Sequence, residues 1–480
     1  MLNLKPEEVW SHFEKISEIP RCSGNEEGIK NYIIEAAAET EMEVKEDEVG
    51  NVLLESKRRP NVILQAHMDM VCEKNSEVEH DFKKDPIRLK EEDGWLTAKG
   101  TTLGADNGIG VALALAVATG NHTVDSVDCL FTVDEERGLN GAANLEVEFI
   151  RGDKLLNLDG EEFGVFTIGC AGGGKTTVDL PIDYEVGNSR DRVKISVKGL
   201  VGGHSGGDID KGRANSIKLL TRLLKSLENN SLNLVEISGG DKHNAIPREA
   251  SAVISVEKDY SATERTLTEK FSELKGEYSK TEPGMNLEVK KIPEGGGQKR
   301  FNAATTRALI NLILALPNGV MAYEKDLDST VETSTNLASV KVRNNTVRVL
   351  MSSRSTRESK LENLRKNRIE AIGEAFGSEV THHEAYPAWQ PDEESKLLDY
   401  SRQVFRDIYG ENPGVKVVHG GLETGIIGEK KENIEMISAG PEIESPHSPE
   451  ERMNIKSVEN FWRFLLALLR ELSEAEESGT

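Results

Sequence analysis

Residues 61–70 have the sequence NVILQAHMDM, a continuous apolar run that ends in His67, Met68 and Asp69. A short apolar run of this kind predicts a strand that is buried on both faces, as in a sheet covered by helices. The polar residues then follow at the carboxyl end of the strand. In an open α/β sheet, ligands bind outside the carboxyl ends of the strands.

Three further apolar segments in the N-terminal part of the chain have acidic residues at one end. They are a predicted helix at 106–119 that begins with Asp106, a predicted strand at 126–133 followed by Asp134, Glu135 and Glu136, and a short predicted strand at 155–158 followed by Asp159. This alternation of strands and helices predicts an α/β fold, with a mixed sheet flanked by helices.

The C-terminal part resumes this pattern, with predicted strands at 415–419 and 434–438 and an amphipathic helix at 458–472. In the middle of the chain, pairs of predicted strands alternate with helices, which is typical of an α+β domain. The segment 386–391, YPAWQP, is the predicted linker back to the first domain. We therefore expect one α/β domain formed by residues 1–187 and 390–480, and an inserted α+β domain of residues 188–389.

The charge balance excludes some classes of partner. The formal net charge is −24 at pH 7, and a chain this acidic repels phosphate backbones, which argues against nucleic-acid binding. No apolar run is long enough to span a membrane. The N-terminal sequence MLNLKPEEVWSHFEKI is charged and amphipathic, unlike a signal peptide. We therefore expect a cytoplasmic protein with no membrane partner.

The cysteines give no further signal. Cys22, Cys72, Cys129 and Cys170 are scattered and form no CxxC pair. The sequence therefore predicts neither a disulfide framework nor a zinc ribbon.

The acidic clusters and the histidine together indicate a metal site. A single strand-end aspartate is usually a turn former, and an HxD sequence by itself is a weak signal. Several acidic clusters at strand ends, in sequence order with an HxD, are much less expected by chance. Imidazole and carboxylate together suit zinc, and many carboxylates with few histidines favour a pair of ions that share a bridging carboxylate.

The motifs of the chain resemble those of the aminoacyl-histidine dipeptidases (Xaa-His dipeptidases, carnosinase-like enzymes). These belong to a larger class of two-metal aminopeptidases, carboxypeptidases and aminoacylases. The resemblance covers almost the whole chain. The matching segments are LQAHMDMV, HDFKKDPI, GTTLGADNGIG, TVDEERGLNGA, LLNLDGEEFG, GLVGGHSGGDI, HNAIPREA, PNGV, AYPAWQPD, HGGLETG and GPEIESPHSPEERMNI.

The resemblance implies a catalytic domain with two Zn²⁺ ions, for which Mn²⁺ or Co²⁺ are possible substitutes, since sequence does not choose among them. The implied metal ligands are His67, Asp106, Glu136, Asp159 and His447. Asp106 would bridge the ions, Asp159 would complete the site of His67, and Glu136 and His447 would bind the other ion. His419 could be mistaken for a ligand, but the family pattern places the last ligand at His447.

The same resemblance implies the catalytic residues. Asp69 would orient the imidazole of His67 from outside the metal shell, and Glu135 would be the general base that activates water and then protonates the leaving amine. The inserted domain would be a lid, whose His204 could donate to the developing oxyanion. Taken alone, His204 is more simply a loop histidine beside flexible glycines.

Three residues are candidates for substrate binding. Arg354 could hold the terminal carboxylate of a dipeptide through a bidentate pair, although any single arginine is more often part of a surface salt bridge. Asn244 matches a family position that contacts the substrate end. Glu423, in HGGLE, would face the substrate amine or the metal shell. Closure of the lid would assemble the site and exclude water.

Residues 169–176, GCAGGGKT, match the phosphate-loop pattern GxxxxGK[ST]. A phosphate loop must open a helix, whereas the next residues, TVDLPI, alternate like a strand and meet a proline. We therefore expect these glycines to turn the strand at 163–170 back on itself, and we do not expect nucleotide binding.

We therefore expect a metal-dependent hydrolase of dipeptides, including those that end in histidine such as β-alanyl-histidine. The alternative is a related two-metal aminoacylase or carboxypeptidase. The presence of Glu135 beside all five ligands argues against a metal-binding scaffold without catalysis. A homodimer is plausible from the frequency of dimers alone.

Overall fold

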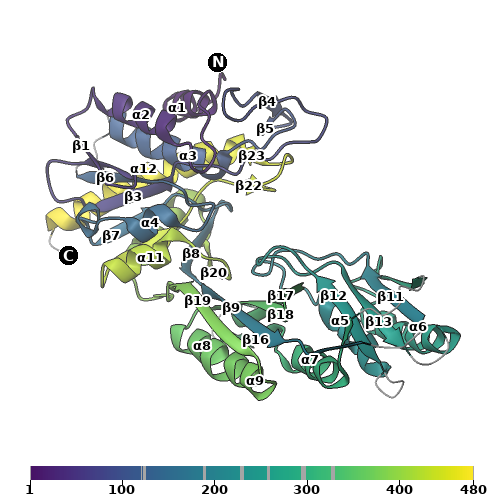
Figure 1. Cartoon of the computed structure of the whole chain (residues 1–480). Coiled ribbons are helices and arrows are strands. Elements are labelled where there is room, and N and C mark those ends of the chain that lie inside the picture. Colours follow the sequence, from purple (N-terminus) through teal and green to yellow (C-terminus); the bar gives the residue numbers. More distant parts are fainter. Residues whose placement is uncertain are drawn as a thin grey trace. The chain divides into compact units, whose positions relative to one another are not determined.

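Figure 1 shows a computed structural model of the chain, in which residues 2–120, 122, 126–186, 191–227, 232–256, 260–292, 299–325 and 330–478 are described. The chain forms two compact units. Unit 1 comprises Met1–Cys170, Trp389–Val417 and Leu422–Thr480, and unit 2 comprises Ala171–Ala388 and Val418–Gly421. The chain therefore first passes from unit 1 to unit 2 after Cys170, earlier than the boundary expected after residue 187.

The main sheet of unit 1 has the strand order β1-β2-β6-β3-β7-β21-β8-β20. The strands are β1 (Glu43–Glu46), β2 (Val52–Glu55), β3 (Val62–His67), β6 (Val127–Thr132), β7 (Lys154–Asn157), β8 (Val165–Cys170), β20 (Gly414–Val418) and β21 (Glu435–Ser438). Strands β6, β3, β7 and β21 are parallel to one another, whereas β2 and β8 pair antiparallel with β6 and β21. The sheet is mixed, which confirms the predicted α/β class.

Helices cover this sheet. They are α1 (Glu7–Ser17), α2 (Glu27–Ala37), α3 (Ala105–Thr119), α4 (Asn140–Asn144), α10 (Lys396–Tyr409), α11 (Glu423–Lys430) and α12 (Ile455–Ser478). Figure 1 shows α1, α2 and α3 together on one side of the sheet and α4 and α11 on the other. Every residue of α3 from Ala105 to Val117 is buried, because α3 packs between the sheet and the outer helices α1 and α2.

A smaller sheet of unit 1 connects two distant parts of the chain. Its order is β22-β23-β5-β4, formed by β4 (Leu89–Glu92), β5 (Trp95–Ala98), β22 (Ile443–Glu444) and β23 (Arg452–Asn454). The pairing of β23 with β5 holds the C-terminal segment that follows β22 beside the segment that precedes α3.

Unit 2 is built on an antiparallel sheet in the order β14-β11-β13-β12-β17-β18-β9-β19, with β16 beside β17. Its strands are β9 (Gly172–Pro181), β11 (Asp191–Lys198), β12 (Asn233–Gly239), β13 (Ala250–Val256), β14 (Asn286–Ile292), β16 (Gly319–Tyr323), β17 (Val331–Arg343), β18 (Thr346–Ser355) and β19 (Glu379–Tyr386). Short strands β10 (Tyr184–Val186) and β15 (Lys299–Phe301) pair separately. The helices are α5 (Ser216–Ser226), α6 (Tyr260–Glu277), α7 (Ala303–Ala315), α8 (Glu358–Glu362), the π-helix η3 (Asn363–Ile369) and α9 (Glu370–Ala375).

The glycine-rich segment at the start of unit 2 is a strand. Strand β9 pairs with β18 and β19, so no helix follows the glycines and the phosphate-loop pattern is coincidental. The expectation that the glycines turn the preceding strand back on itself was wrong, because β8 and β9 belong to different sheets. A Cβ atom at Gly172 would lie 2.6 Å from the backbone nitrogen of Ala388. Glycine is therefore required where two backbones approach closely.

A disulfide joins Cys22 to Cys72, with 5.7 Å between their Cα atoms. The sequence analysis predicted no disulfide framework and did not identify this single bond. The chain after β3 returns beside the segment after α1, where the Met70 N–H donates to the Arg21 carbonyl. The two cysteines are 50 residues apart, and their spacing alone does not indicate this return.

Among the described residues, no helix is long and apolar enough to cross a membrane.

We predict that Gly172→Ala destabilises unit 2 by about 1–3 kcal/mol, since the added methyl group would overlap the neighbouring backbone. Gly276, exposed on α6, has no atom within 4 Å of an added Cβ, so Gly276→Ala is a matched control that should stabilise slightly through helix propensity. Scanning calorimetry measures both effects. Equal melting temperatures for the two variants would contradict the close approach of the two backbones at Gly172.

Candidate metal centre

The predicted ligands of unit 1 meet at one edge of its main sheet. Parallel pairing aligns His67 of β3 with Thr132 of β6 and Gln65 of β3 with Asn157 of β7. The residues that follow these strands therefore emerge at the same carboxyl edge. The first turn of α3 brings Asp106 to this edge.

Asp106 lies at the centre of the cluster. One of its carboxylate oxygens is 3.0 Å from Nε2 of His67, which is itself 3.5 Å from a carboxylate oxygen of Asp159. The other oxygen of Asp106 is 3.0 Å from Nε2 of His447, which is 3.1 Å from Glu136. His67, Asp106 and Asp159 thus form one potential metal-binding group, and Asp106, Glu136 and His447 form another. The two groups share Asp106, as a bridging ligand requires.

The electrostatics of the cluster favour bound cations. Burial raises the pKa of Glu136 and of Asp159. Hydrogen bonds to Asp106 and Glu136 raise the pKa of His447 to about 11. Burial would by itself raise the pKa of Asp106, but hydrogen bonds with His447 and His67 hold it well below its ordinary value. Protons on the imidazoles therefore balance the negative charge of the carboxylates. Divalent ions bound to the same donor atoms would also balance this charge.

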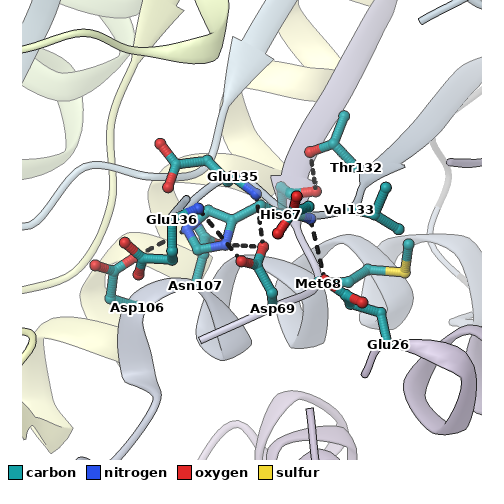
Figure 2. Close-up of polar contacts among 12 residues, drawn as sticks. Glu26, His67, Met68, Asp69, Asp106, Asn107, Thr132, Val133, Glu135 and Glu136 are labelled. Carbon is teal, nitrogen blue, oxygen red and sulfur yellow. Dashed lines mark hydrogen bonds and ion pairs between the residues drawn. The ribbon is translucent and has the colours of Figure 1, made fainter. Parts of the chain in front are cut away.

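Asp69 connects the histidine to the neighbouring acidic segment. It is fully buried, and one of its oxygens lies 3.3 Å from Nδ1 of His67. Its carboxylate also accepts the backbone N–H of Glu135 at 3.0 Å and that of Glu136 at 3.3 Å. Figure 2 shows Asp69 between the ring of His67 and this backbone. Burial would raise the pKa of Asp69, but the hydrogen bond with His67 lowers it to about 2.

Glu135 lies in a strongly acidic environment. Burial raises its pKa well above the ordinary value, and the nearby charges of Glu136, Asp159 and Glu423 act in the same direction, while His67 opposes them. A carboxyl group whose pKa is raised above its ordinary value holds a proton more readily, which suits it to general base and acid chemistry.

Glu423, at the start of α11, is buried in a polar network with the two central strands. Its Oε2 accepts from Nε2 of Gln65 at 2.6 Å and from the hydroxyl of Thr132 at 2.7 Å. Burial raises its pKa to about 7. Its Oε1 has no hydrogen-bond partner among the described residues.

The candidate residues of unit 2 form a group of their own. The Nδ1 atom of His204 accepts the backbone N–H of Gly206 at 3.3 Å and of Gly207 at 3.2 Å. This arrangement favours the neutral tautomer with the proton on Nε2, which is the form that an oxyanion donor needs. The Ser205 N–H donates to the backbone carbonyl of Asn244 at 2.7 Å, so the loops of His204 and Asn244 are joined.

Arg354, on β18, is buried and donates from Nη1 to the hydroxyl of Tyr386 at 2.9 Å. Its Nε has no hydrogen-bond partner among the described residues. His419 binds the hydroxyl of Ser334 through Nε2 at 2.7 Å, and burial together with the charge of Arg354 lowers its pKa to about 3. No potential metal-binding group of the described residues includes His419.

One residue of the centre was not among the predictions. Asn107 donates its side-chain N–H to the Asp159 carboxylate and to the Leu158 carbonyl at 3.3 Å. It therefore holds the loop after β7 beside the start of α3. Its position directly after Asp106, inside an apolar helix, was the available signal.

Comparison with known proteins identifies the family. The model of the peptidase family M20/M25/M40 matches residues 63–471. The sequence is 37% identical over 479 residues to the cytosol non-specific dipeptidase of Escherichia coli (strain K12), with 98% of each chain covered.

Solved structures agree with this assignment. The aminoacylhistidine dipeptidase from Vibrio alginolyticus is similar with a TM-score of 0.85 and 36% identity, covering 98% of this chain and 97% of that chain. The aminopeptidase PepT from Bacillus cereus has a TM-score of 0.56 at 15% identity, with 98% and 99% covered, and shows the fold alone. Because the family model spans most of the sequence, the chain belongs to peptidase family M20/M25/M40.

Proposed function

We propose that this protein is a dipeptidase that hydrolyses its substrates at a two-metal centre in unit 1, including dipeptides that end in histidine. The observation that carries the proposal is the pair of potential metal-binding groups that share Asp106. The dipeptidases of E. coli and V. alginolyticus support the substrate class, because each is similar to this chain over nearly its whole length.

We propose Zn²⁺ as the metal, with Mn²⁺ or Co²⁺ as substitutes. His67 and Asp159 would hold one ion, Glu136 and His447 the other, and Asp106 both. When bound there, such ions would supply Lewis acidity to the scissile carbonyl and lower the pKa of a bound water. Asp69 would fix the ring of His67 through Nδ1, which leaves Nε2 for the metal.

The proton transfers are assigned to Glu135. Its backbone N–H is held by Asp69, so the residue is anchored to the same carboxylate that orients His67. Its raised proton affinity allows it to take a proton from the attacking water and to deliver that proton to the leaving amine. Glu423 lies close enough to influence this proton affinity, and we retain it as a candidate for contact with the substrate amine.

The unit 2 residues would bind the rest of the substrate. Arg354 is preoriented by Tyr386 and would pair with the terminal carboxylate. His204 would donate from Nε2 to the oxyanion, and Asn244 would contact the substrate end. They would act either within the same subunit or across a homodimer. The name of the E. coli relative supports a cytoplasmic location.

The first test compares metal-free and metal-restored enzyme on β-alanyl-histidine and several α-dipeptides. Activity should disappear with chelator and return with Zn²⁺ or Mn²⁺. Glu135→Gln should lower kcat by at least about 10²-fold while metal stays bound, since proton transfer contributes ~10²–10⁴-fold. Release of acetate from N-acetyl amino acids without dipeptide cleavage would instead indicate an aminoacylase.

Metal affinity should rise with pH. The pKa of His447 is raised from 6.5 to about 11 in the metal-free centre, so its ring is protonated at neutral pH and a bound ion must displace that proton. The stability that this proton gives to the metal-free protein is complete below pH 6.5 and is lost as the pH rises through about 11. Calorimetric titration in buffers of different ionisation enthalpy counts the released protons. His447→Asn should release fewer, and an unchanged count would contradict the assignment.

Arg354→Met should raise KM for free dipeptides by roughly 10–100-fold, because a hydrogen bond to a charged group contributes about 1.5–3 kcal/mol. Dipeptides with an amidated C-terminus should be affected much less. Tyr386→Phe, which removes only the hydroxyl beside Nη1, should give a smaller change in the same direction. Equal losses on free and amidated substrates would show that Arg354 does not bind the carboxylate.

A further inference from the structure

Glu451 is a buried carboxylate that binds the backbone of the segment bearing Asp106. Its Oε2 accepts the N–H of Leu103 at 2.7 Å and of Gly104 at 2.9 Å. Its Oε1 accepts the N–H of Ala105 at 2.8 Å and of Asp106 at 3.2 Å. The start of α3 has no side-chain cap from its own N-cap residue. A residue more than 300 positions away therefore satisfies these backbone donors.

Arg21 binds the same segment from another direction. Its guanidinium is buried and donates from Nη1 to the carbonyls of Met68 at 3.1 Å and Asp69 at 2.8 Å, and from Nη2 to the carbonyl of Gly104. One side chain thus joins the turn after His67 to the segment before Asp106.

Gly104 is held by both charged residues, since its N–H binds Glu451 and its carbonyl binds Arg21. Its φ is +69°, and a Cβ atom there would lie 2.5 Å from Nη2 of Arg21 and 2.7 Å from the sulfur of Met70. Only glycine meets both conditions without strain. The backbone conformation that orients Asp106 is therefore constrained both by these hydrogen bonds and by the close packing around Gly104.

We infer that Arg21 and Glu451 are a positioning pair for the metal centre, an inference that rests on the proposed two-metal function. Neither residue belongs to a potential metal-binding group of the described residues. Their hydrogen bonds hold the backbones of Asp69 and Asp106 in place before a metal arrives. A bridging carboxylate must be held within about 0.5 Å to serve two ions, and supporting residues outside the metal shell provide that precision.

Electrostatics support the same role. Burial lowers the pKa of Arg21 to about 10, while the charges of Glu451, Asp69, Asp106 and Glu136 raise it. The guanidinium remains charged at neutral pH. It therefore supplies fixed positive charge beside the acidic cluster without occupying a ligand position.

The chain offers a matched control at the opposite end of the sheet. Asp128, at the start of β6, is fully buried, accepts the Ser56 N–H at 2.8 Å and lies 3.6 Å from Arg151. It shares with Glu451 a buried carboxylate, a backbone N–H donor and a nearby arginine. It holds no segment that bears a proposed ligand.

The experiment compares Glu451→Gln and Arg21→Lys with Asp128→Asn in the full chain. Zn²⁺ affinity is measured by competition with a chelating dye, the ligand field by the visible absorption of the Co²⁺-loaded protein, and stability by thermal unfolding of the metal-free protein. Glutamine keeps one acceptor but turns an N–H₂ donor towards two backbone N–H groups. Both Glu451→Gln and Arg21→Lys should weaken Zn²⁺ binding about 10–100-fold, as removal of such supporting residues typically does, and should alter the Co²⁺ spectrum.

Asp128→Asn should lower the melting temperature and leave both metal readouts unchanged. If Glu451→Gln and Arg21→Lys also lower only the melting temperature, the pair is an ordinary structural cap and the inference is overturned. Should Glu451→Gln fail to fold, Arg21→Lys retains the charge and one donor group and decides the question. A wild-type protein that binds no metal would refute the proposed function instead, because the variants then have no affinity to lose.

Discussion

The geometry of the candidate metal centre depends on the carboxylate of Asp106, whose two oxygens face two different histidines at 3.0 Å each. A carboxylate can occupy this position only if separate segments arrive at one place in the correct orientation. The parallel register of β3, β6 and β7 brings three of them to a common edge. Helix α3 brings the fourth, and the small sheet of β23 and β5 brings the C-terminal segment.

Concentrated negative charge imposes a second requirement. Carboxyl groups are gathered where burial disfavours their ionised form, so the fold must provide positive charge or protons. Imidazole protons and the guanidinium of Arg21 provide it in the metal-free protein. Divalent ions would do so more effectively, because each ion binds several carboxylates at once. The clustered carboxylates, which are unfavourable in the metal-free protein, thereby give the centre its affinity for metal.

Local patterns in the sequence located the elements of this centre, since each strand is an apolar run followed by polar residues and the helix begins with Asp106 before an apolar run. The strand predicted at 61–70 and the helix predicted at 106–119 correspond to β3 (Val62–His67) and α3 (Ala105–Thr119). Pairing between distant segments was not predictable. No local signal joins Cys22 to Cys72, turns β9 away from β8, or sets Glu451 against the start of α3. The family resemblance supplied the site residues, but it did not reveal the backbone contacts of Arg21 and Glu451.

His447 follows Asp106 by 341 positions, and the segment that forms unit 2 lies between them in the sequence. During synthesis, a nascent chain on the ribosome already contains the strands and the helix that bear the other proposed ligands, yet it lacks His447 and the carboxylate of Glu451. The proposed metal centre would therefore be complete only after the intervening segment has been translated. With the ligands proposed here, the order of the sequence would delay catalytic capability until the segment that forms unit 2 and the segment that bears His447 have both been made.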